Sequence, residues 1–441
     1  MLDGRSGLIS RALPSSCEQE TKWAYMTYRI GVEVPNGKRR FEVDFEEDVG
    51  LRKTSKVCSH DDSISRAHFD RFSSACANSQ RQSDGQTDID CLINPIGRDM
   101  TINCLLRLSR VDYGSIASLN RSFLSLIKSG EMYRLRRQNK VIEHWVYFSC
   151  RLLEWVAFDP VTRRWMQLPR MNSNECFMCS DKESLAVGTE LLVFGKDLMS
   201  HVVYKYSILT NSWSLGMSMN SPRCLFGSAS LGEIAILAGG CDSRGNVLDS
   251  AELYDSEKQT WVTLPSMIKP RKMCSGVFMD GKFYVIGGIG GNDSRVLTCG
   301  EEFDLKTWTW KEIPDMSPGN HGAATENDIP APAEAPPLVA VVNNELYAAD
   351  YADMEVKKYN KENKSWASVG RLPERAGSMN GWGLAFRACG DRLIVIGGPR
   401  GHGEGVIEVN SWVPSDGPPQ WHMLGRKQCG SFVYNCAVMG C

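Results

Sequence analysis

The feature that most constrains this chain is an aromatic residue followed seven positions later by tryptophan, repeated five times after residue 150. The pairs are Phe158/Trp165, Tyr206/Trp213, Tyr254/Trp261, Phe303/Trp310 and Tyr359/Trp366, and a looser sixth copy ends at Trp421. Successive tryptophans lie 48, 48, 49, 56 and 55 residues apart. A fixed period of roughly 50 residues marks a repeat architecture in which each unit is one small sheet. The sequence therefore predicts six similar units.

A second element of each repeat is a short apolar strand that often ends in two glycines. The clear copies are EIAILAGG (233–240), KFYVIGG (282–288) and RLIVIGG (392–398), and the weaker ones are ELLVFGK (190–196) and ELYAAD (345–350). Glycine accepts positive φ and lets another backbone approach closely, as crowding near a central axis requires. Because one sheet of short strands cannot bury both of its faces, the repeats predict blades stacked around a ring.

The two ends of the repeat region indicate how the ring closes. The first unit, which starts near residue 141, lacks the strand that precedes the apolar strand in the other units. The C-terminal segment RKQCGSFVYNCAVMG (426–440) matches RKMCSGVFMDG (271–281), with Cys429 aligned to Cys274. We therefore expect a strand at 431–439 to complete the first blade.

Residues 88–138 have a different pattern, because the double-glycine strands are replaced by helical spacing. Ile102, Leu105 and Leu106 fall on one helical face, and a second set follows at the same spacing from Ile116 to Leu126. Residues 1–87 are rich in polar residues with little periodicity, so we expect most of them to be disordered.

The residues of both regions resemble known families. The glycine pair, the Tyr-Asp of LYD and the tryptophan at a fixed offset resemble the kelch motif over 141–441, and Leu92, Pro95, the helix Ile102 to Leu108 and the later FLSLI resemble an F-box. The chain is thus similar to plant-type F-box/kelch-repeat proteins. This resemblance implies an all-β six-bladed kelch β-propeller with a small N-terminal all-α F-box-like module.

The resemblance also implies a function. Such a protein is the non-catalytic substrate-recognition subunit of an SCF-type cullin-RING ubiquitin ligase, which binds a Skp-family adaptor, through it a cullin, and a protein substrate. The implied adaptor-binding residues are Leu92, Pro95, Ile96, Ile102, Leu105, Leu106 and Leu108. Two alternatives are a kelch scaffold without a ligase role and a metal-dependent propeller enzyme.

The expected substrate site follows from propeller geometry. In an up-and-down blade the first and third turns lie on one face of the ring, and the second turn and the link to the next blade lie on the other. The first set is short in this chain and the second is long, and long loops on a rigid scaffold are where binding residues concentrate. The candidates on or beside the long loops are Arg223, Arg244, Lys272, Arg295, His321, Trp382, Arg400 and Lys427. This arginine-rich set suits an acidic or phosphorylated segment.

Composition excludes several other classes. The 50 basic and 52 acidic residues give a net charge of −2, so no basic field indicates nucleic acid. No uncharged apolar stretch reaches the roughly 18 residues of a membrane helix, and no signal peptide is evident, which favours the nucleus or cytoplasm. The single Cys176-x-x-Cys179 pair has no second pair for zinc, and the seven histidines lie in different segments. We therefore expect no catalytic residue, metal site or cofactor. Because the chain is long and shows no export signal, we also expect its cysteines to be reduced.

Overall fold

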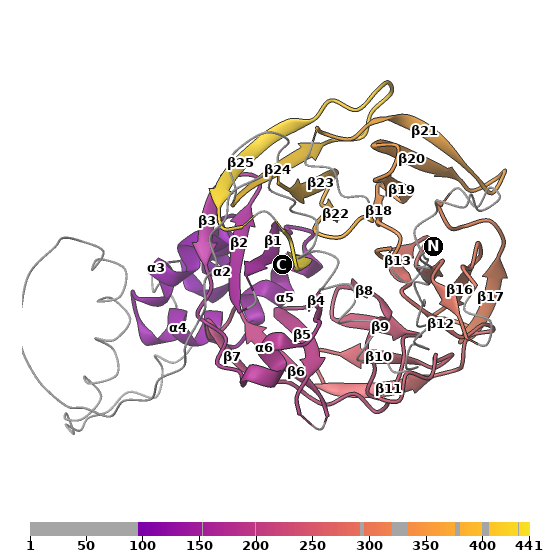
Figure 1. Cartoon of the computed structure of the whole chain (residues 1–441). Helices are drawn as coiled ribbons and strands as arrows, with labels where there is room; N and C mark the ends of the chain where they lie inside the picture. Colours follow the sequence, from indigo (N-terminus) through magenta and orange to yellow (C-terminus); the bar gives the residue numbers. More distant parts are fainter. Residues whose placement is uncertain are drawn as a thin grey trace, which may run out of the picture.

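The computed structural model is a ring of four-stranded antiparallel sheets with a group of short helices at one side (Figure 1). It describes residues 96–151, 153–198, 200–291, 295–319, 334–374, 380–398, 405–430 and 432–441. Within these residues six four-stranded sheets form the blades, and a two-stranded ladder is added to the fourth. The innermost strands of successive blades adjoin one another around the axis. The predicted six-bladed propeller is therefore confirmed.

The strands of the first three blades follow one order from the axis outward. Blade 1 contains β26 (Asn435–Gly440), β1 (His144–Arg151), β2 (Glu154–Asp159) and β3 (Arg164–Gln167). Blade 2 contains β4 (Glu183–Val187), β5 (Glu190–Lys196), β6 (His201–Ser207) and β7 (Ser212–Leu215). Blade 3 contains β8 (Gly227–Leu231), β9 (Ile234–Ala238), β10 (Ala251–Asp255) and β11 (Thr260–Leu264).

The other three blades are built in the same way. Blade 4 contains β13 (Ser275–Met279), β14 (Lys282–Ile286), β16 (Gly300–Asp304) and β17 (Thr309–Ile313), with the ladder of β12 (Arg271–Lys272) and β15 (Ile289–Gly290). Blade 5 contains β18 (Val339–Val342), β19 (Glu345–Asp350), β20 (Glu355–Asn360) and β21 (Ser365–Arg371). Blade 6 contains β22 (Ala385–Cys389), β23 (Arg392–Gly397), β24 (Val406–Trp412) and β25 (His422–Gln428).

The aromatic and tryptophan repeat holds each blade together and ties it to the blade before it. Tyr254 of β10 lies directly opposite Trp261 of β11, with ring centroids 4.8 Å apart. The indole Nε1 of Trp310 in blade 4 donates to the carbonyl oxygen of Pro265 in the link from blade 3 at 2.7 Å. Trp213 makes the equivalent bond from blade 2 to blade 1 at 2.8 Å. Because the ring packs within its own sheet while its N–H bonds to the preceding link, the repeat contributes to both sheet pairing and blade stacking.

The double glycines lie where two backbones meet. Gly287 and Gly288 have φ of 62° and 94°, which side chains rarely adopt. A Cβ on Gly288 would lie 2.6 Å from the carbonyl oxygen of Lys272, in the segment that enters the same blade. The pair therefore allows the close approach that the sequence predicts.

The C-terminal strand lies in the first blade. β26 pairs with β1 along its length, from His144 opposite Gly440 to Ser149 opposite Asn435. The strand begins at Asn435 rather than at 431, and residues 426–428 belong to β25, the outer strand of blade 6. The expected alignment of RKQC with RKMC is therefore wrong, because the shared letters fall in an outer strand at one place and before an inner strand at the other.

The helices precede the ring. They are α2 (Gly97–Leu106), a 3₁₀ turn (Arg110–Asp112), α3 (Tyr113–Ala117), α4 (Arg121–Lys128) and α5 (Glu131–Gln138), with α6 (Glu175–Cys179) between blades 1 and 2. We call residues 96–138 the helical module. Asn120 caps α4 by accepting a hydrogen bond from the backbone N–H of Phe123 at 2.8 Å. Residues 1–87, which we expect to be mostly disordered, lie outside the described residues.

No helix in the described part of the chain is long and apolar enough to cross a membrane.

Candidate protein-interaction surfaces

The connections between strands divide the propeller into two faces. In blade 3 the β8–β9 turn has two residues (232–233) and the β10–β11 turn has four (256–259), whereas the β9–β10 connection has twelve (239–250). Because the strands alternate in direction, the first two turns lie on one face and the long connection lies on the other. We call these the short-turn face and the long-loop face.

The helical module is docked on the short-turn face. Arg137 of α5 pairs with Glu233 in the β8–β9 turn, and Arg134 lies 3.3 Å from Glu257 in the β10–β11 turn. A Cβ added to Gly130, just before α5, would lie 3.3 Å from the side chain of Leu209 in the β6–β7 turn. These contacts place the module over the short-turn ends of blades 2 and 3.

The module and the first two blades share one hydrophobic core. Ile102, Leu105 and Leu106 of α2 are only 9%, 7% and 5% exposed, and they belong to the same buried cluster as Trp145 and Tyr147 of β1. Because burial of apolar surface is favourable, such a continuous core holds the module in a fixed position on the propeller. The helices and the propeller therefore pack as one unit.

This burial revises the expected adaptor surface. Ile102, Leu105 and Leu106 face the shared core, so their side chains offer almost no surface to a partner in this structure. Ile96 and Leu108 remain 44% and 40% exposed. Leu92 and Pro95 lie outside the described residues. The periodicity identified the buried face of α2, because an apolar stripe has the same spacing whether it packs inside its own chain or against another protein.

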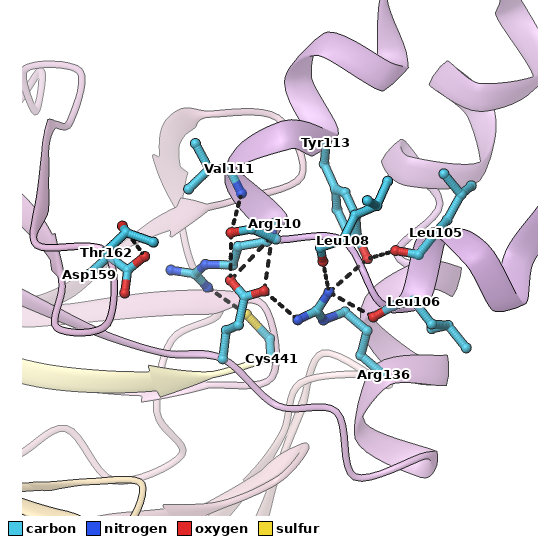
Figure 2. Close-up of polar contacts among 12 residues, drawn as sticks. Leu105, Leu106, Leu108, Arg110, Val111, Tyr113, Arg136, Asp159, Thr162 and Cys441 are labelled. Carbon is cyan, nitrogen blue, oxygen red and sulfur yellow. Dashed lines mark hydrogen bonds and ion pairs between the residues drawn. The ribbon is translucent and has the colours of Figure 1, made fainter.

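A buried arginine holds the helices in place (Figure 2). Arg136 of α5, 1% exposed, donates from Nη1 to the carbonyl oxygens of Leu106 at 3.2 Å and Leu108 at 2.6 Å, at the C-terminal end of α2. Its Nη2 pairs with Glu143 at 2.6 Å, just before β1. Burial lowers the pKa of Arg136, but Tyr113 and Glu143 outweigh that effect and raise it overall. One cation thus joins α2, α5 and the first strand of the propeller.

Arg110 joins the module to the end of β26, as Figure 2 also shows. Its Nη1 donates to the sulfur of Cys441 at 2.7 Å, and its Nη2 donates to the hydroxyl of Tyr147 at 2.9 Å. Its guanidinium carbon lies 4.2 Å from the centre of the Trp145 ring. Burial lowers the pKa of Arg110, but Cys441 and Tyr147 more than offset this, so the pKa is raised. Docking of the module and closure of the ring therefore share one contact.

On the opposite face, Arg223 is buried rather than presented to a partner. Its side chain is 0% exposed and pairs with Glu252 of β10 at 2.7 Å. It also donates to the carbonyl oxygens of Gly239 and Ser250, so it holds both ends of the long β9–β10 connection. Lys272 is also buried, in β12. Arg223 therefore supports the base of the long-loop face, and Lys272 is buried in the same region of blade 4.

Blade 4 contains the same buried arginine–glutamate pair, so the pair is a feature of the repeat and not of blade 3 alone. Arg271 pairs with Glu301 at 2.5 Å, both with 0% exposed side chains, and donates to the carbonyl oxygens of Gly287 and Cys299. Sequence reasoning missed Glu252 and Glu301. A signal was present, since each of these glutamates stands two residues before the repeat aromatic and about 30 residues after its arginine.

Three of the expected substrate-binding cations lie nearer the solvent. Arg244 and Arg295 are exposed and Lys427 is half-buried, with its Nζ 5.4 Å from the Trp165 ring. Trp382 is half-buried. His321 and Arg400 lie outside the described residues. The long-loop face therefore has buried arginines at its base and cations at its rim.

A cavity of about 210 Å³ lies on the long-loop face at the seam between blades 6 and 1. Arg151, Glu154 and Lys427 line it together with Cys150 and Cys429. A hydrogen bond from the Cys150 thiol to Cys429 raises the pKa of Cys150 and, with Lys427 and Arg151 nearby, lowers that of Cys429. Arg151 pairs with Glu154 at 3.3 Å, and Lys427 beside this pair is suited to a carboxylate or phosphate group.

The fold and these surfaces define a kelch-type propeller with a docked helical module, and comparison with known proteins gives the family. The Kelch motif model matches residues 222–268 and 270–317, which contain the two blades with the buried arginine and glutamate pairs. The F-box/kelch-repeat protein SKIP11 of Arabidopsis thaliana is 71% identical over 80% of this chain and 76% of its own length. Two further F-box/kelch-repeat proteins of that plant are 58% and 55% identical over the full length of both chains. The chain belongs to the plant F-box/kelch-repeat family.

Proposed function

We propose that this chain is the substrate-recognition subunit of an SCF-type cullin-RING ubiquitin ligase. The helical module acts as the F-box and binds a Skp-family adaptor, which in turn binds a cullin, while the propeller binds a protein substrate. The chain itself supplies no catalytic residue or cofactor, and it works in the nucleus or cytoplasm. Family membership supports the general role, and the arrangement of the two faces supports the division of labour.

The observation that carries this proposal is the docking of the module on the short-turn face. The module's contacts with Glu233, Glu257 and Leu209 all lie there. The long connections and their rim cations, Arg244 and Lys427, lie on the other face. A partner on the outer side of the module and a partner on the long loops can therefore bind at the same time, as a receptor requires.

The adaptor surface is assigned to the apolar side chains that the module leaves exposed. Met100 of α2 is 59% exposed, Leu119 between α3 and α4 is 70% exposed, and Ile96 and Leu124 are 44% and 36% exposed. α3 and α4 lie at the outer edge of the molecule, away from the ring (Figure 1). Because a few apolar anchors carry most of the affinity of such an interface, these exposed side chains of the module are the anchors expected for an adaptor.

A binding measurement with a purified Skp-family adaptor tests this assignment. Met100→Glu combined with Leu119→Glu should weaken adaptor binding by at least about tenfold, because a few buried anchors carry most of the affinity of such an interface. Leu215→Glu is the matched control, since Leu215 is 68% exposed on an outer strand of the propeller. Undiminished binding by the folded double variant would contradict the proposed adaptor surface.

The substrate surface is assigned to Arg244, Arg295 and Lys427 with the seam cavity, and the substrate is a protein with an acidic or phosphorylated segment. A scaffold without a ligase role would show no binding to the adaptor in the same measurement. For the metal-enzyme alternative, the described residues contain no group of three or more His, Cys, Asp or Glu placed to hold a metal ion. No specific observation therefore favours that alternative.

A further inference from the structure

Two cysteines face each other at the base of the long-loop face in blade 3. Cys224 lies in the segment that leads into β8, and Cys241 directly follows the glycine pair after β9. The two residues form an isolated antiparallel bridge, with backbone hydrogen bonds of 3.0 Å and 2.8 Å in the two directions. Their sulfur atoms are 3.5 Å apart. The pair is therefore held in register by the backbone as well as by side-chain contact.

This geometry is close to that of a disulfide but not ideal for one. Opposed residues in a hydrogen-bonded antiparallel pair have Cα atoms about 5.5 Å apart, within the range that disulfides span. Their Cβ atoms are roughly 4.5–5.5 Å apart, whereas disulfides prefer about 3.8 Å. A bond between these residues would form with a small backbone shift and would carry strain, and strained disulfides are the readily reduced ones.

Blade 4 provides an internal reference for this position. There the equivalent bridge joins Lys272 of β12 to Ile289 of β15, in the same ladder between the incoming segment and the end of the second strand. The ladder thus forms without cysteine. The cysteine pair in blade 3 is therefore not required by the fold, and its chemistry is available for another purpose.

We propose that Cys224 and Cys241 form a reversible disulfide by exchange with a low-molecular-weight disulfide such as oxidised glutathione. The partly exposed Cys224, as thiolate, attacks one sulfur of the small disulfide, whose S–S bond breaks and releases one glutathione thiolate. The thiolate of Cys241, fully buried beside it, then attacks the sulfur of Cys224 and releases the second glutathione. Two cysteine thiols lose two protons and two electrons, and the small disulfide is reduced to two thiols.

The bond would fix the β9–β10 connection to the segment that enters the blade. Cys241 also bridges to Val247 across this loop, and Arg244 lies at its tip. Oxidation would therefore add a covalent tie at the base of the loop, close to the contacts that Arg223 already makes. The chemistry does not depend on the proposed ligase role, so its test is independent of any partner.

The test uses the full chain in buffers with increasing ratios of oxidised to reduced glutathione. Remaining thiols are blocked with one alkylating reagent, disulfides are reduced, and the newly exposed thiols receive a second. Tryptic cleavage after Arg223 and Arg244 leaves both cysteines in one peptide, residues 224–244. The expected result is that this peptide gains the second label on both cysteines in oxidised buffer and returns to the first label when reduced glutathione is added.

Serine variants supply the control. Oxidation should raise the melting temperature of the wild-type chain by about 5 °C, because the tie constrains the unfolded chain, and this increase should be absent in Cys224→Ser and Cys241→Ser. Both variants should melt like the wild type in reducing buffer. The proposal is overturned if the peptide keeps the first label on both cysteines under oxidation, or if Cys224 stops at the mixed disulfide with glutathione.

Discussion

The two faces of the propeller use their connections in different ways. On the short-turn face the turns are two to four residues long in blade 3, and their carboxylates Glu233 and Glu257 pair with arginines of α5. On the long-loop face the twelve-residue connection is supported from below by Arg223, and other cations lie at the rim. The comparison teaches that a charged residue near a loop can support it or bind through it, and that burial distinguishes the two.

Removal of an arginine from the base of the long-loop face should have the largest effect. Arg271→Ala leaves the fully buried Glu301 without its cation, and breaking such a pair costs about 3–5 kcal/mol of folding free energy. Chemical denaturation measures this loss. Lys269→Ala is the control, because the Lys269–Glu312 pair is 42% and 35% exposed and contributes at most about 1 kcal/mol. Equal losses of unfolding free energy in the two variants would show that burial does not distinguish the supporting pairs from the exposed ones.

The next largest effect is expected where the module meets the short-turn face. Arg136→Ala removes the side-chain donor to the carbonyl oxygens of Leu106 and Leu108 and the cation that pairs with Glu143, which should cost about 2 kcal/mol. Faster hydrogen exchange in α2 and α5 would report the loosened module. Arg134→Ala should change little, because Arg134 and Glu257 are both about half exposed. An unchanged exchange rate in Arg136→Ala would show that the apolar core alone holds the module.

Charge reversal on the rim should have a smaller effect, confined to binding. Arg244→Glu together with Lys427→Glu should weaken capture of an acidic or phosphorylated substrate several-fold and leave adaptor binding and the melting temperature unchanged. Lys258→Glu and Lys361→Glu make the matched change on the short-turn face, in turns of blades 3 and 5. If the short-turn variants proved the damaging ones, the assignment of the faces would be reversed.

The smallest expected effect is a change of stability with pH, caused by one histidine at the short-turn face. Burial and the nearby Arg110 lower the pKa of His144, the first residue of β1. The folded chain therefore binds a proton less readily than the unfolded chain, whose histidine has a pKa near ~6.5. The stability that neutral His144 contributes is complete above the pKa of the unfolded chain and is lost as the pH falls below that value. Between pH 7 and pH 5 the melting temperature should fall less in His144→Gln than in the wild type, and an equal fall would exclude this contribution.

The propeller could be predicted from the sequence because its signals are local and repeated. Tyr254 and Trp261 lie opposite each other within one hairpin, so their spacing of seven recurs wherever the hairpin does. The start of β26 was misplaced because a match of four letters cannot tell an outer strand from an inner one. The burial of Arg223 depends on Glu252, 29 residues away, and only the fold brings them together.

The interaction surfaces could be predicted only in part. Leu105 and Leu106 were correctly placed on the apolar face of a helix, but their membership of a buried core that continues into blades 1 and 2 is a tertiary feature that the local pattern does not encode. Met100 and Leu119 were not singled out, since an exposed apolar side chain has no sequence signature of its own. Arg244 and Arg295 were expected on long loops and are exposed there, while their role in substrate binding stays a prediction.

Hydrogen exchange of the chain with and without a bound Skp-family adaptor tests the central claim most directly. The account predicts that the adaptor slows exchange in the outer part of the module, around Met100, Leu119 and Leu124, and leaves residues 239–250 on the long-loop face unchanged. Protection of 239–250 by the adaptor, with the outer helices unaffected, would contradict it.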